Sequence, residues 1–332
     1  MEKEVLDFQK DIAAIYGEEI AAEARRIARS GRRMNLKSDV GFKLFFCNDS
    51  PEAQFCLRSF LTAATGRKVS EATVTNGELL PESFFGKKPR LDVNCTFDGG
   101  QRADIELQLT RADDDQVLRS VYYACRLYSG GLKSGSLYAN APNTYQIFLV
   151  DFDVFGDRKF YHRGMFRLDD GRVMTERLQI RFFGFPAVGN MEKPEDAKRV
   201  DADLPKVRNW CRFVEGCNKQ GLLEGLARDA GWQEELTMAL KAYNKVSEEE
   251  RAWAYHLSMD RAEADYNNGI RLAAEKAAKK AAKEAAKKAH AEGKKEMAFD
   301  IARRMLLNHE PLEKIAEYSG LSIENVQRLQ NA

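Results

Sequence analysis

The sequence contains few of the residues that form zinc sites or disulfides. Its 332 residues include six cysteines and four histidines. The cysteines form no Cys-x-x-Cys pair, and no histidine lies near a cysteine at ligand spacing. We therefore expect reduced, mostly buried thiols in a cytosolic protein, and no zinc site. The cysteines are Cys47, Cys56, Cys95, Cys125, Cys211 and Cys217, and the histidines are His162, His256, His290 and His309.

Long apolar runs, a strong charge of one sign and nucleotide-binding motifs are also absent from the sequence. No run approaches the roughly 18 apolar residues of a membrane span, and the opening stretch MEKEVLDFQKD has no apolar signal-peptide core. Net charge is +1 although 31% of the residues are charged, so nucleic-acid binding must come from local patches. A Walker A motif, a nucleophile elbow and a Gly-rich dinucleotide fingerprint are missing. The sequence favours a cytoplasmic protein with no membrane segment.

Residues 87–110, KKPRLDVNCTFDGGQRADIELQLT, predict a β-hairpin. Asp98-Gly99-Gly100 is the predicted turn, because glycine adopts the positive φ that a tight hairpin loop requires. Successive side chains of a strand point to opposite faces. One face of the hairpin is therefore apolar and predicted to be core; it consists of Leu91, Val93, Cys95, Phe97, Ala103, Ile105, Leu107 and Leu109.

The opposite face of this hairpin is polar and carries two carboxylates on facing strands. With a three-residue loop, Asp92 lies directly across from Glu106, and Arg90 lies across from Gln108. Like charges placed opposite one another destabilise a sheet, and Mg²⁺, which takes carboxylate oxygens, removes that conflict. The alternative is a solvated polar face with both carboxylates in water, an ordinary arrangement for a half-exposed antiparallel hairpin.

The order of several stretches resembles a family of nucleases. Asp92, followed across a Gly turn by Glu106-Leu107-Gln108 on the next strand, resembles the site pattern of the PD-(D/E)XK nuclease superfamily. More narrowly, the chain is similar to the recombination-promoting nuclease and transposase family from about residue 34 to the C-terminus. The other matching stretches are 34–46 (MNLKSDVGFKLFF), Arg119 with Tyr122-Tyr123, 132–138 (LKSGSLY), 145–152 (YQIFLVDF), Trp210 with Phe213, and IAEYSGLSIENVQRL in the tail.

The resemblance implies an α/β fold, a PD-(D/E)XK nuclease-like mixed sheet flanked by helices, with the activity of a metal-dependent DNA endonuclease. Asp92 and Glu106 would hold Mg²⁺ or Mn²⁺, together with the backbone carbonyl of Leu107. Asp39, on a helix before the core strands, is the candidate that completes the metal shell. Its alternative is plain helix capping, for which Ser38 is equally suited. The metal would lower the pKa of a bound water and offset charge on the scissile phosphate.

The position that usually carries a catalytic lysine departs from the superfamily pattern. Gln108 stands where the superfamily usually has lysine, and glutamine can orient water by hydrogen bonding but carries no charge. Lys43, Lys88 or Arg90 could supply the charge, and Lys43, one helical turn from Asp39, is preferred. The alternative function is a catalytically weak or inactive nuclease-fold protein that binds DNA or self-associates.

Contacts with DNA are expected from one helix and from the hairpin. Residues 115–130 predict a helix on which Arg119, Tyr122 and Arg126 share one face, at i, i+3 and i+7. That face would contact the DNA backbone; the alternative is a helix packed on the sheet with its arginine tips in water. The expected DNA-binding residues are Arg119, Tyr122, Arg126, Lys88 and Arg90.

Four segments are predicted along the chain: an N-terminal helical arm at 1–33, the nuclease-like domain at 34–190, a helical region at 207–308 and a small tail at 309–332. The arm ends in an arginine cluster, which is either a solvated helix end or a contact to phosphates. The helical region contains a long Ala/Lys-rich helix.

The long helix and the tail predict self-association or DNA binding. Alanine pairs recur every four residues, about 40° beyond a full turn, so the apolar stripe winds around the helix. A single solvated helix is therefore favoured over a long coiled coil. The tail is helix-turn-helix-like, but its second helix has little positive charge, so packing or self-association is an equal alternative to DNA reading. The expected partners are DNA and a second copy of the chain.

Overall fold

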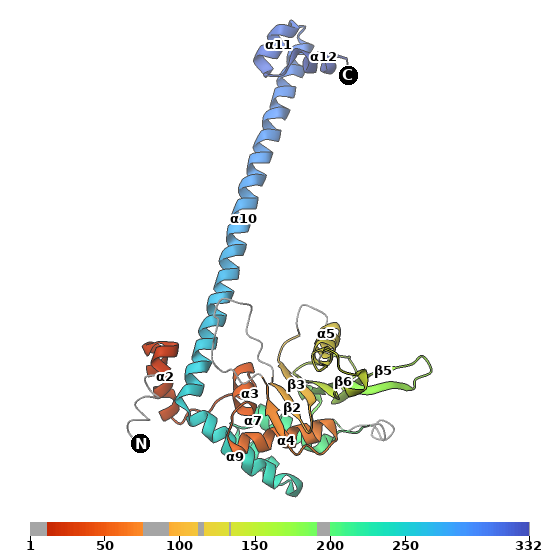
Figure 1. Cartoon of the computed structure of the whole chain (residues 1–332). Helices are drawn as coiled ribbons and strands as arrows, with labels where there is room; N and C mark the ends of the chain where they lie inside the picture. The colour runs from red at the N-terminus through yellow and green to blue at the C-terminus, as the bar shows by residue number, and fades with distance from the viewer. Residues whose placement is uncertain (1–11, 76–92, 112–115, 133, 191–199, 332) are drawn as a thin grey trace. The chain divides into compact units, whose positions relative to one another are not determined.

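The computed structural model describes residues 12–75, 93–111, 116–132, 134–190 and 200–331 (Figure 1). The chain divides into two compact units, Met1–Met259 and Asp260–Ala332. The first unit holds a mixed sheet with helices around it, and the second is helical. The segments 76–92 and 191–199 lie outside the described residues, together with both chain ends.

The centre of the first unit is a sheet in which six strands are described: β1 Ala72–Val74, β2 Val93–Phe97, β3 Gln101–Gln108, β4 Thr144–Val150, β5 Tyr161–Arg167 and β6 Val173–Gly184. The strand order is β1-β2-β3-β4-β6-β5. The first three strands form an antiparallel meander, β3, β4 and β6 run parallel, and β5 pairs antiparallel with β6. Every residue of β4 is buried, including the polar Thr144 and Gln146, as in a central strand covered on both faces. This is the predicted α/β fold.

The predicted hairpin is confirmed where it is described. Phe97 pairs with Gln101 and Val93 with Ile105, so the loop consists of the three predicted residues between the strands. Gly99 and Gly100 have φ values of 75° and 98°, a conformation that glycine adopts at no steric cost. The predicted core face is buried at Val93, Cys95, Phe97, Ala103, Ile105 and Leu107.

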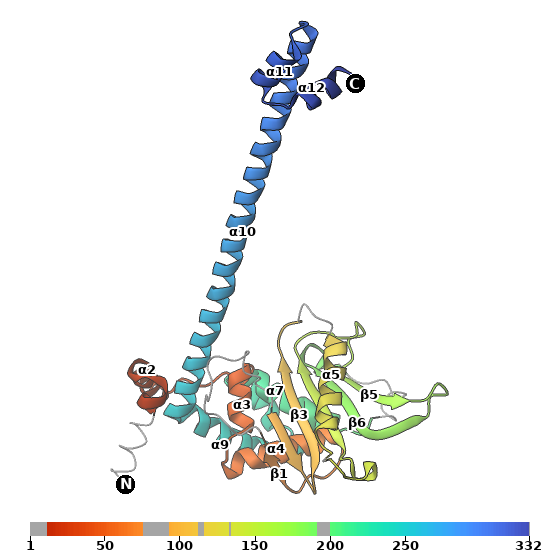
Figure 2. The same ribbon diagram turned by 45° about the horizontal axis from the view of Figure 1, so that its top comes forward.

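Helices cover both faces of the sheet. Helix α5 (Gln116–Ser129) contacts β3, β4 and β6 on one face (Figure 2). Beneath it, Phe148, Val150 and Phe182 form a small apolar cluster with Tyr123. The other face of the sheet belongs to a large core cluster of buried hydrophobic side chains, which includes Val93, Ile105 and Ile147. The helices that contribute side chains to this cluster include α3 Asp39–Phe46, α4 Pro51–Thr65, α7 Leu204–Gly216, α8 Gln220–Ala227 and α9 Gln233–Glu248.

Aromatic rings fill the centre of the large core cluster. Phe45 and Phe46 of α3 pack against Trp210 of α7, with ring centroids 6.5 and 6.2 Å away. Phe213 and Trp232 complete the group. The short segment SDVGFKLFF therefore anchors the helical layer through its buried aromatic rings, because each such ring contributes a large share of the stability of a core.

The N-terminal helix α2 (Glu18–Arg29) contributes to this core. Its side chains Ile20, Ala24 and Ile27 are buried in the large cluster. Arginines of the predicted cationic cluster pair with carboxylates: Arg29 with Glu250 at 3.3 Å and Arg33 with Glu248 at 3.5 Å, and Arg25 and Arg26 with glutamates of α2 itself.

A buried arginine lies in the sheet on the face away from α5. The side chain of Arg181 on β6 is fully buried, and it donates to the carbonyl of Ala64, to Gln179 Oε1 and to Asp201 Oδ2, at 2.6–2.7 Å. The Asp201 carboxylate also binds Arg163 at 2.7 Å. Burial opposes ionisation of Asp201, but the neighbouring guanidinium of Arg181 outweighs it and holds the pKa below its usual value.

Helix α10 (Glu250–Leu307) begins in the first unit and continues through the second, and all described side chains in 271–290 are exposed. The two predicted tail helices are present as α11 (Leu312–Ser319) and α12 (Ile323–Gln330). Ala302, Ile315 and Val326 form the core of this unit. None of the described helices has the length and apolarity needed to cross a membrane.

Candidate functional site

The candidate carboxylate Glu106 lies on the central strand β3 and is only 2% exposed. It pairs with Phe148 of β4 in the parallel register, and paired residues share a face of the sheet. Because Phe148 packs with Tyr123 of α5, Glu106 lies on the face that α5 covers. Gln108 shares this face, and its Nε2 donates to Glu106 Oε2 at 3.3 Å.

Further polar side chains are buried on the same face. Asp104 is 5% exposed, and Gln146 Nε2 donates to its Oδ2 at 2.7 Å. Gln116 of α5 is also buried, and within the described part of the chain its amide has no hydrogen-bond partner. The alternative that this face is solvated is therefore wrong for Asp104 and Glu106. The helix α5 encloses a polar layer, which an isolated hairpin does not reveal.

Three of the predicted site residues lie outside the described residues: Asp92, Lys88 and Arg90. The hairpin register is established as far as Val93, the residue that follows Asp92 in the sequence. The expected pairing of Asp92 with Glu106 stays a prediction.

Helix α3 carries the two predicted site residues that precede the hairpin. Ser38 caps this helix, accepting from the Gly41 N–H at 3.1 Å, so Asp39 is the first helical residue and is exposed. Lys43 is buried on the same helix. The helix packs in the cluster that contains Ile105, whereas Glu106 belongs to the opposite face of β3. The structure therefore shows Lys43 and Glu106 on elements of different layers.

The predicted DNA-binding face of α5 is partly exposed. Tyr122 is 61% exposed and Arg126 is also exposed. Arg119 is half-buried, with its guanidinium carbon 5.2 Å from the centroid of the Tyr123 ring. The buried face of the helix consists of Gln116, Ser120 and Ala124. Small and polar residues, together with Tyr123, thus pack on the sheet, while Tyr122 and Arg126 are exposed.

An ion-pair cluster that sequence reasoning missed lies at the end of β4. Lys37 Nζ is 2.9 Å from Asp151 Oδ1 and 3.3 Å from Glu215 Oε1. Burial works against the charged form of Lys37, but these two carboxylates outweigh it and raise its pKa. Asp151 also donates its N–H to the Gln108 carbonyl at 2.9 Å, which joins this cluster to the end of β3. The acidic residue directly after the YQIFLV run was the available signal.

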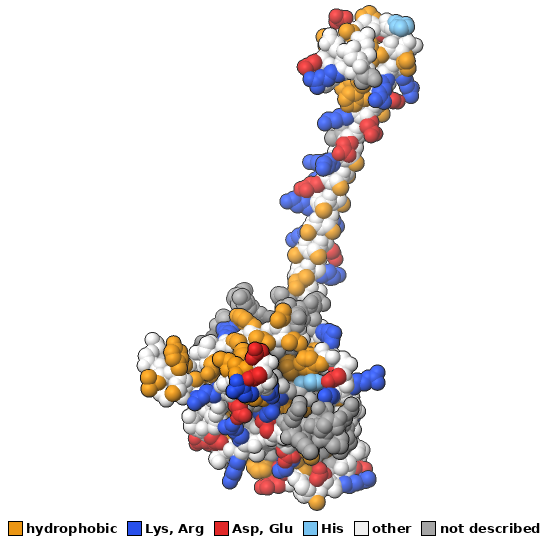
Figure 3. Space-filling model, turned by 90° about the vertical axis from the view of Figure 1, so that its right-hand side faces the viewer, with side chains coloured by type: hydrophobic (Ala, Val, Ile, Leu, Met, Phe, Trp, Pro, Cys, Tyr) orange, Lys and Arg blue, Asp and Glu red, His pale blue; other side chains and the backbone are white. Residues whose placement is uncertain are grey.

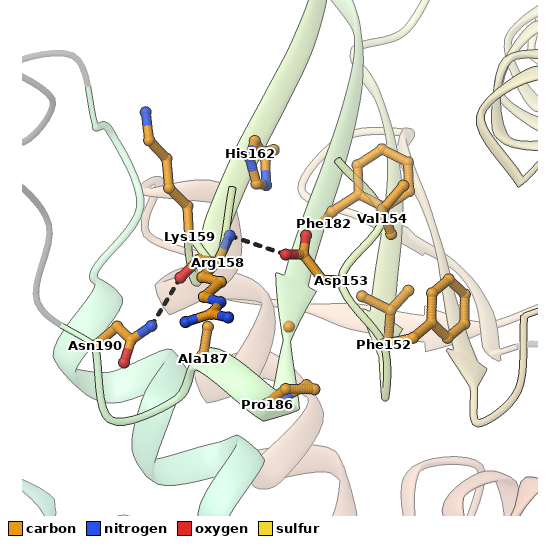
Figure 4. Close-up of a pocket in the computed structure, with 12 residues that line it drawn as sticks. Phe152, Asp153, Val154, Arg158, Lys159, His162, Phe182, Pro186, Ala187 and Asn190 are labelled. Carbon is orange, nitrogen blue, oxygen red and sulfur yellow. Dashed lines mark hydrogen bonds between the residues drawn. The ribbon is translucent and has the colours of Figure 1, made fainter. Parts of the chain in front are cut away.

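A cavity of about 440 Å³ was also missed. It opens where β4 and β6 end (Figure 4). Its lining residues are Val150, Phe152, Asp153, Val154, Arg158, Lys159, His162, Phe182, Gly184, Pro186, Ala187 and Asn190. The sequence signal was topological, because ligands of open α/β sheets bind beyond the carboxyl ends of parallel strands.

The donor set around Glu106 suits a hard cation in part. Within the described ranges, no three His, Cys, Asp or Glu side chains converge as a metal-binding group. Glu106 offers one buried carboxylate with the amide of Gln108 beside it, and oxygen donors are the ligands that Mg²⁺ takes. The expected set draws its remaining carboxylates from Asp92 and Asp39.

Comparison with known proteins identifies one family. The family model described as PD-(D/E)XK nuclease family transposase matches residues 36–273. The match begins before α3 and ends within α10, so it includes the six described strands and the helices α3, α4, α5, α7, α8 and α9, but not α2. No curated protein and no solved structure gives a significant match.

Proposed function

Since the chain belongs to the PD-(D/E)XK nuclease family transposases, we propose that it is a metal-dependent DNA endonuclease with Glu106 at its centre. The observation that carries the proposal is the burial of Glu106 on β3, beside Gln108, within the matched segment. A carboxylate placed under α5 has little water around it, so its attraction for a cation is stronger than that of a surface carboxylate. The family match supports a nuclease; cleavage of DNA and the metal are the proposal.

The proposed metal ligands are Asp92, Glu106, the backbone carbonyl of Leu107 and Asp39, and the proposed metal is Mg²⁺ or Mn²⁺. When bound, the metal lowers the pKa of a water and offsets charge on the scissile phosphate. Gln108 is already hydrogen-bonded to Glu106, and its amide can orient a water by donating or accepting. Lys43 is proposed to supply the positive charge that Gln108 lacks.

DNA is proposed to bind through local contacts. The face shown in Figure 3 carries blue and red side chains interspersed, rather than a field of one sign. Arg119, Tyr122 and Arg126 of α5, with Lys88 and Arg90, are proposed to contact phosphates. Such contacts position a strand without reading its sequence.

A second candidate function is favoured by Gln108. Because a glutamine stands at the position of the superfamily's usual lysine, the chain could be a catalytically weak relative that binds DNA. Self-association through α10, α11 and α12 would then be its retained role. This candidate predicts binding that is lost at high salt, with no cation-dependent cleavage.

Nicking of supercoiled plasmid with Mg²⁺, Mn²⁺ or EDTA tests the proposal. Glu106→Gln should lower metal-dependent nicking at least about 100-fold, while leaving the melting temperature of the metal-free protein unchanged or slightly higher, because one of two opposed carboxylates is neutralised. Glu176→Gln, an exposed carboxylate on β6, is the matched control and should cut like the parent. Parent protein that binds DNA but never nicks it would instead support the second candidate.

A further inference from the structure

The cavity at the carboxyl ends of β4 and β6 has a polar mouth and an apolar wall. Phe152, Val154 and Phe182 line one side, and Arg158 and Asn190 line the other (Figure 4). Its volume of about 440 Å³ falls within the ~300–1,000 Å³ of small-ligand sites. The composition suits a ligand with one flat apolar part and one charged part.

The backbone of Arg158 is held in an unfavourable conformation at this mouth. Its φ is 58°, in the left-handed region that residues with a Cβ rarely adopt. The Asp153 carboxylate accepts the Arg158 N–H at 2.9 Å and the Gly156 N–H at 2.8 Å. On the other side, Asn190 Nδ2 donates to the Arg158 carbonyl at 2.7 Å. Strain that neighbouring groups enforce in this way is typical of ligand clamps.

The guanidinium of Arg158 has no ion-pair partner among the residues that the structure describes. Its neighbour Asp153 is engaged by backbone N–H groups, and Asp157 pairs with His162 Nε2 at 3.0 Å. Figure 4 shows the Arg158 guanidinium beside Ala187, whereas Lys159 extends away from it. The strained loop thus presents the exposed guanidinium of Arg158 at the mouth of the cavity, without an ion-pair partner in the described part of the chain.

The cavity and the candidate nuclease site lie at the same end of the sheet, where β3, β4 and β6 finish, and on the same face. Gln108 pairs with Val150, which lines the cavity, and Val150 pairs with Gly184, which lines it too. Neighbouring strands lie about 4.8 Å apart, so two strand spacings, or about 10 Å, join Gln108 to the far wall.

We propose that this cavity binds one unstacked nucleotide of a nucleic-acid strand. The Arg158 guanidinium binds the phosphate, and Phe152 with Val154 provides the apolar surface for the base. Arginine binds phosphate with paired donors, and an aromatic ring such as that of Phe152 can stack on a base of any sequence. The inference rests on the proposed function, because the bound nucleotide belongs to the strand that is cut near Glu106. The preferred substrate is therefore DNA with an unpaired stretch beside the cleavage point.

Equilibrium binding in EDTA tests this inference independently of cleavage. The full-length protein is titrated with a labelled single-stranded deoxyoligonucleotide, and thymidine monophosphate, thymidine and inorganic phosphate serve as competitors. Thymidine monophosphate should compete saturably, inorganic phosphate more weakly and thymidine least. Arg158→Gly and Arg158→Asn should weaken the affinity for the oligonucleotide at least tenfold.

Both variants retain a residue that tolerates positive φ, so each should melt no lower than the parent. Arg172→Gly is the matched control: it removes an exposed arginine in the turn between β5 and β6 and should leave binding unchanged. Oligonucleotide affinity equal to the parent's in Arg158→Gly and Arg158→Asn overturns the inference, as does failure of thymidine monophosphate to compete. A parent that binds nucleotide but cuts no plasmid refutes only the nuclease proposal.

Discussion

Replacing Asp201 by asparagine tests the buried guanidinium of Arg181. Breaking a fully buried ion pair by removing one partner costs about 3–5 kcal/mol, because the other charge stays buried. Two features of this pair reduce that figure: the Asp201 side chain is 37% exposed, so water screens it, and asparagine keeps an oxygen that can accept from Arg181. We expect Asp201→Asn to lower the free energy of unfolding by about 2 kcal/mol at neutral pH.

The pH dependence of this loss identifies its cause. The pKa of Asp201 is below its usual value of 3.8 in the folded protein. Its contribution is therefore complete above that value and is lost as the pH falls through the folded pKa. The difference between the parent and Asp201→Asn should shrink progressively as the pH falls below 3.8 and the parent's carboxyl takes up its proton.

Urea unfolding at neutral pH and at a series of pH values below 3.8, down to the lowest at which the parent folds, measures both effects. Glu176→Gln removes an exposed carboxylate and should change stability by less than about 0.5 kcal/mol. A loss below about 0.5 kcal/mol in Asp201→Asn, or a loss of equal size over the whole acid series, would show that the carboxylate does not stabilise the Arg181 charge.

Two further predictions concern the packing of the first unit. In thermal melts, Gly66→Ala should destabilise the protein by about 2 kcal/mol or more, because φ at this residue is 69° and a Cβ would lie 1.8 Å from the Asp201 carbonyl oxygen. Gly221→Ala in α8 is the control: nothing lies within 4 Å of its added Cβ, so it should be neutral or stabilising. In the folded protein, a thiol-reactive disulfide reagent should modify the thiol of the exposed Cys125 rapidly. The other five cysteines are buried, and burial raises the pKa of the Cys47 thiol to about 11 and that of the Cys95 thiol to about 12. Cys125→Ser should remove the rapid phase, and a second thiol of equal rate would contradict the burial of the others.

Local sequence patterns predicted the elements of the first unit because each element carries its own periodicity. The Gly99-Gly100 turn specifies the loop length of the hairpin, and the loop length specifies the register. Residues 147–150 of β4 form an uninterrupted apolar run, and the long helix is evident from its composition. These features need no knowledge of tertiary contacts.

The environment of the candidate site depends on contacts between distant segments, which no local pattern encodes. Glu106 alternates with apolar residues as a solvated residue would, yet it is buried on the face of the sheet that α5 covers. Arg181 is a charged residue within a strand, and its buried guanidinium needs hydrogen-bond acceptors from distant parts of the chain. These are the carbonyl of Ala64, far before it in the sequence, and the carboxylate of Asp201, after it. The cavity needs the ends of β4 and β6 to meet, which is a property of the parallel topology.

The solvated part of α10 has a consequence for how the chain can change over evolution. All residues of 271–290 are exposed; the hydrophobic cluster before this stretch extends to Met259, and the one after it begins at Ala302. No side chain of this stretch must keep register with a neighbour, so gaining or losing one four-residue Ala/Lys repeat leaves both cores intact. The length of this stretch is therefore free to drift between descendants, whereas a single-residue insertion in β3 would turn Glu106 to the opposite face of the sheet.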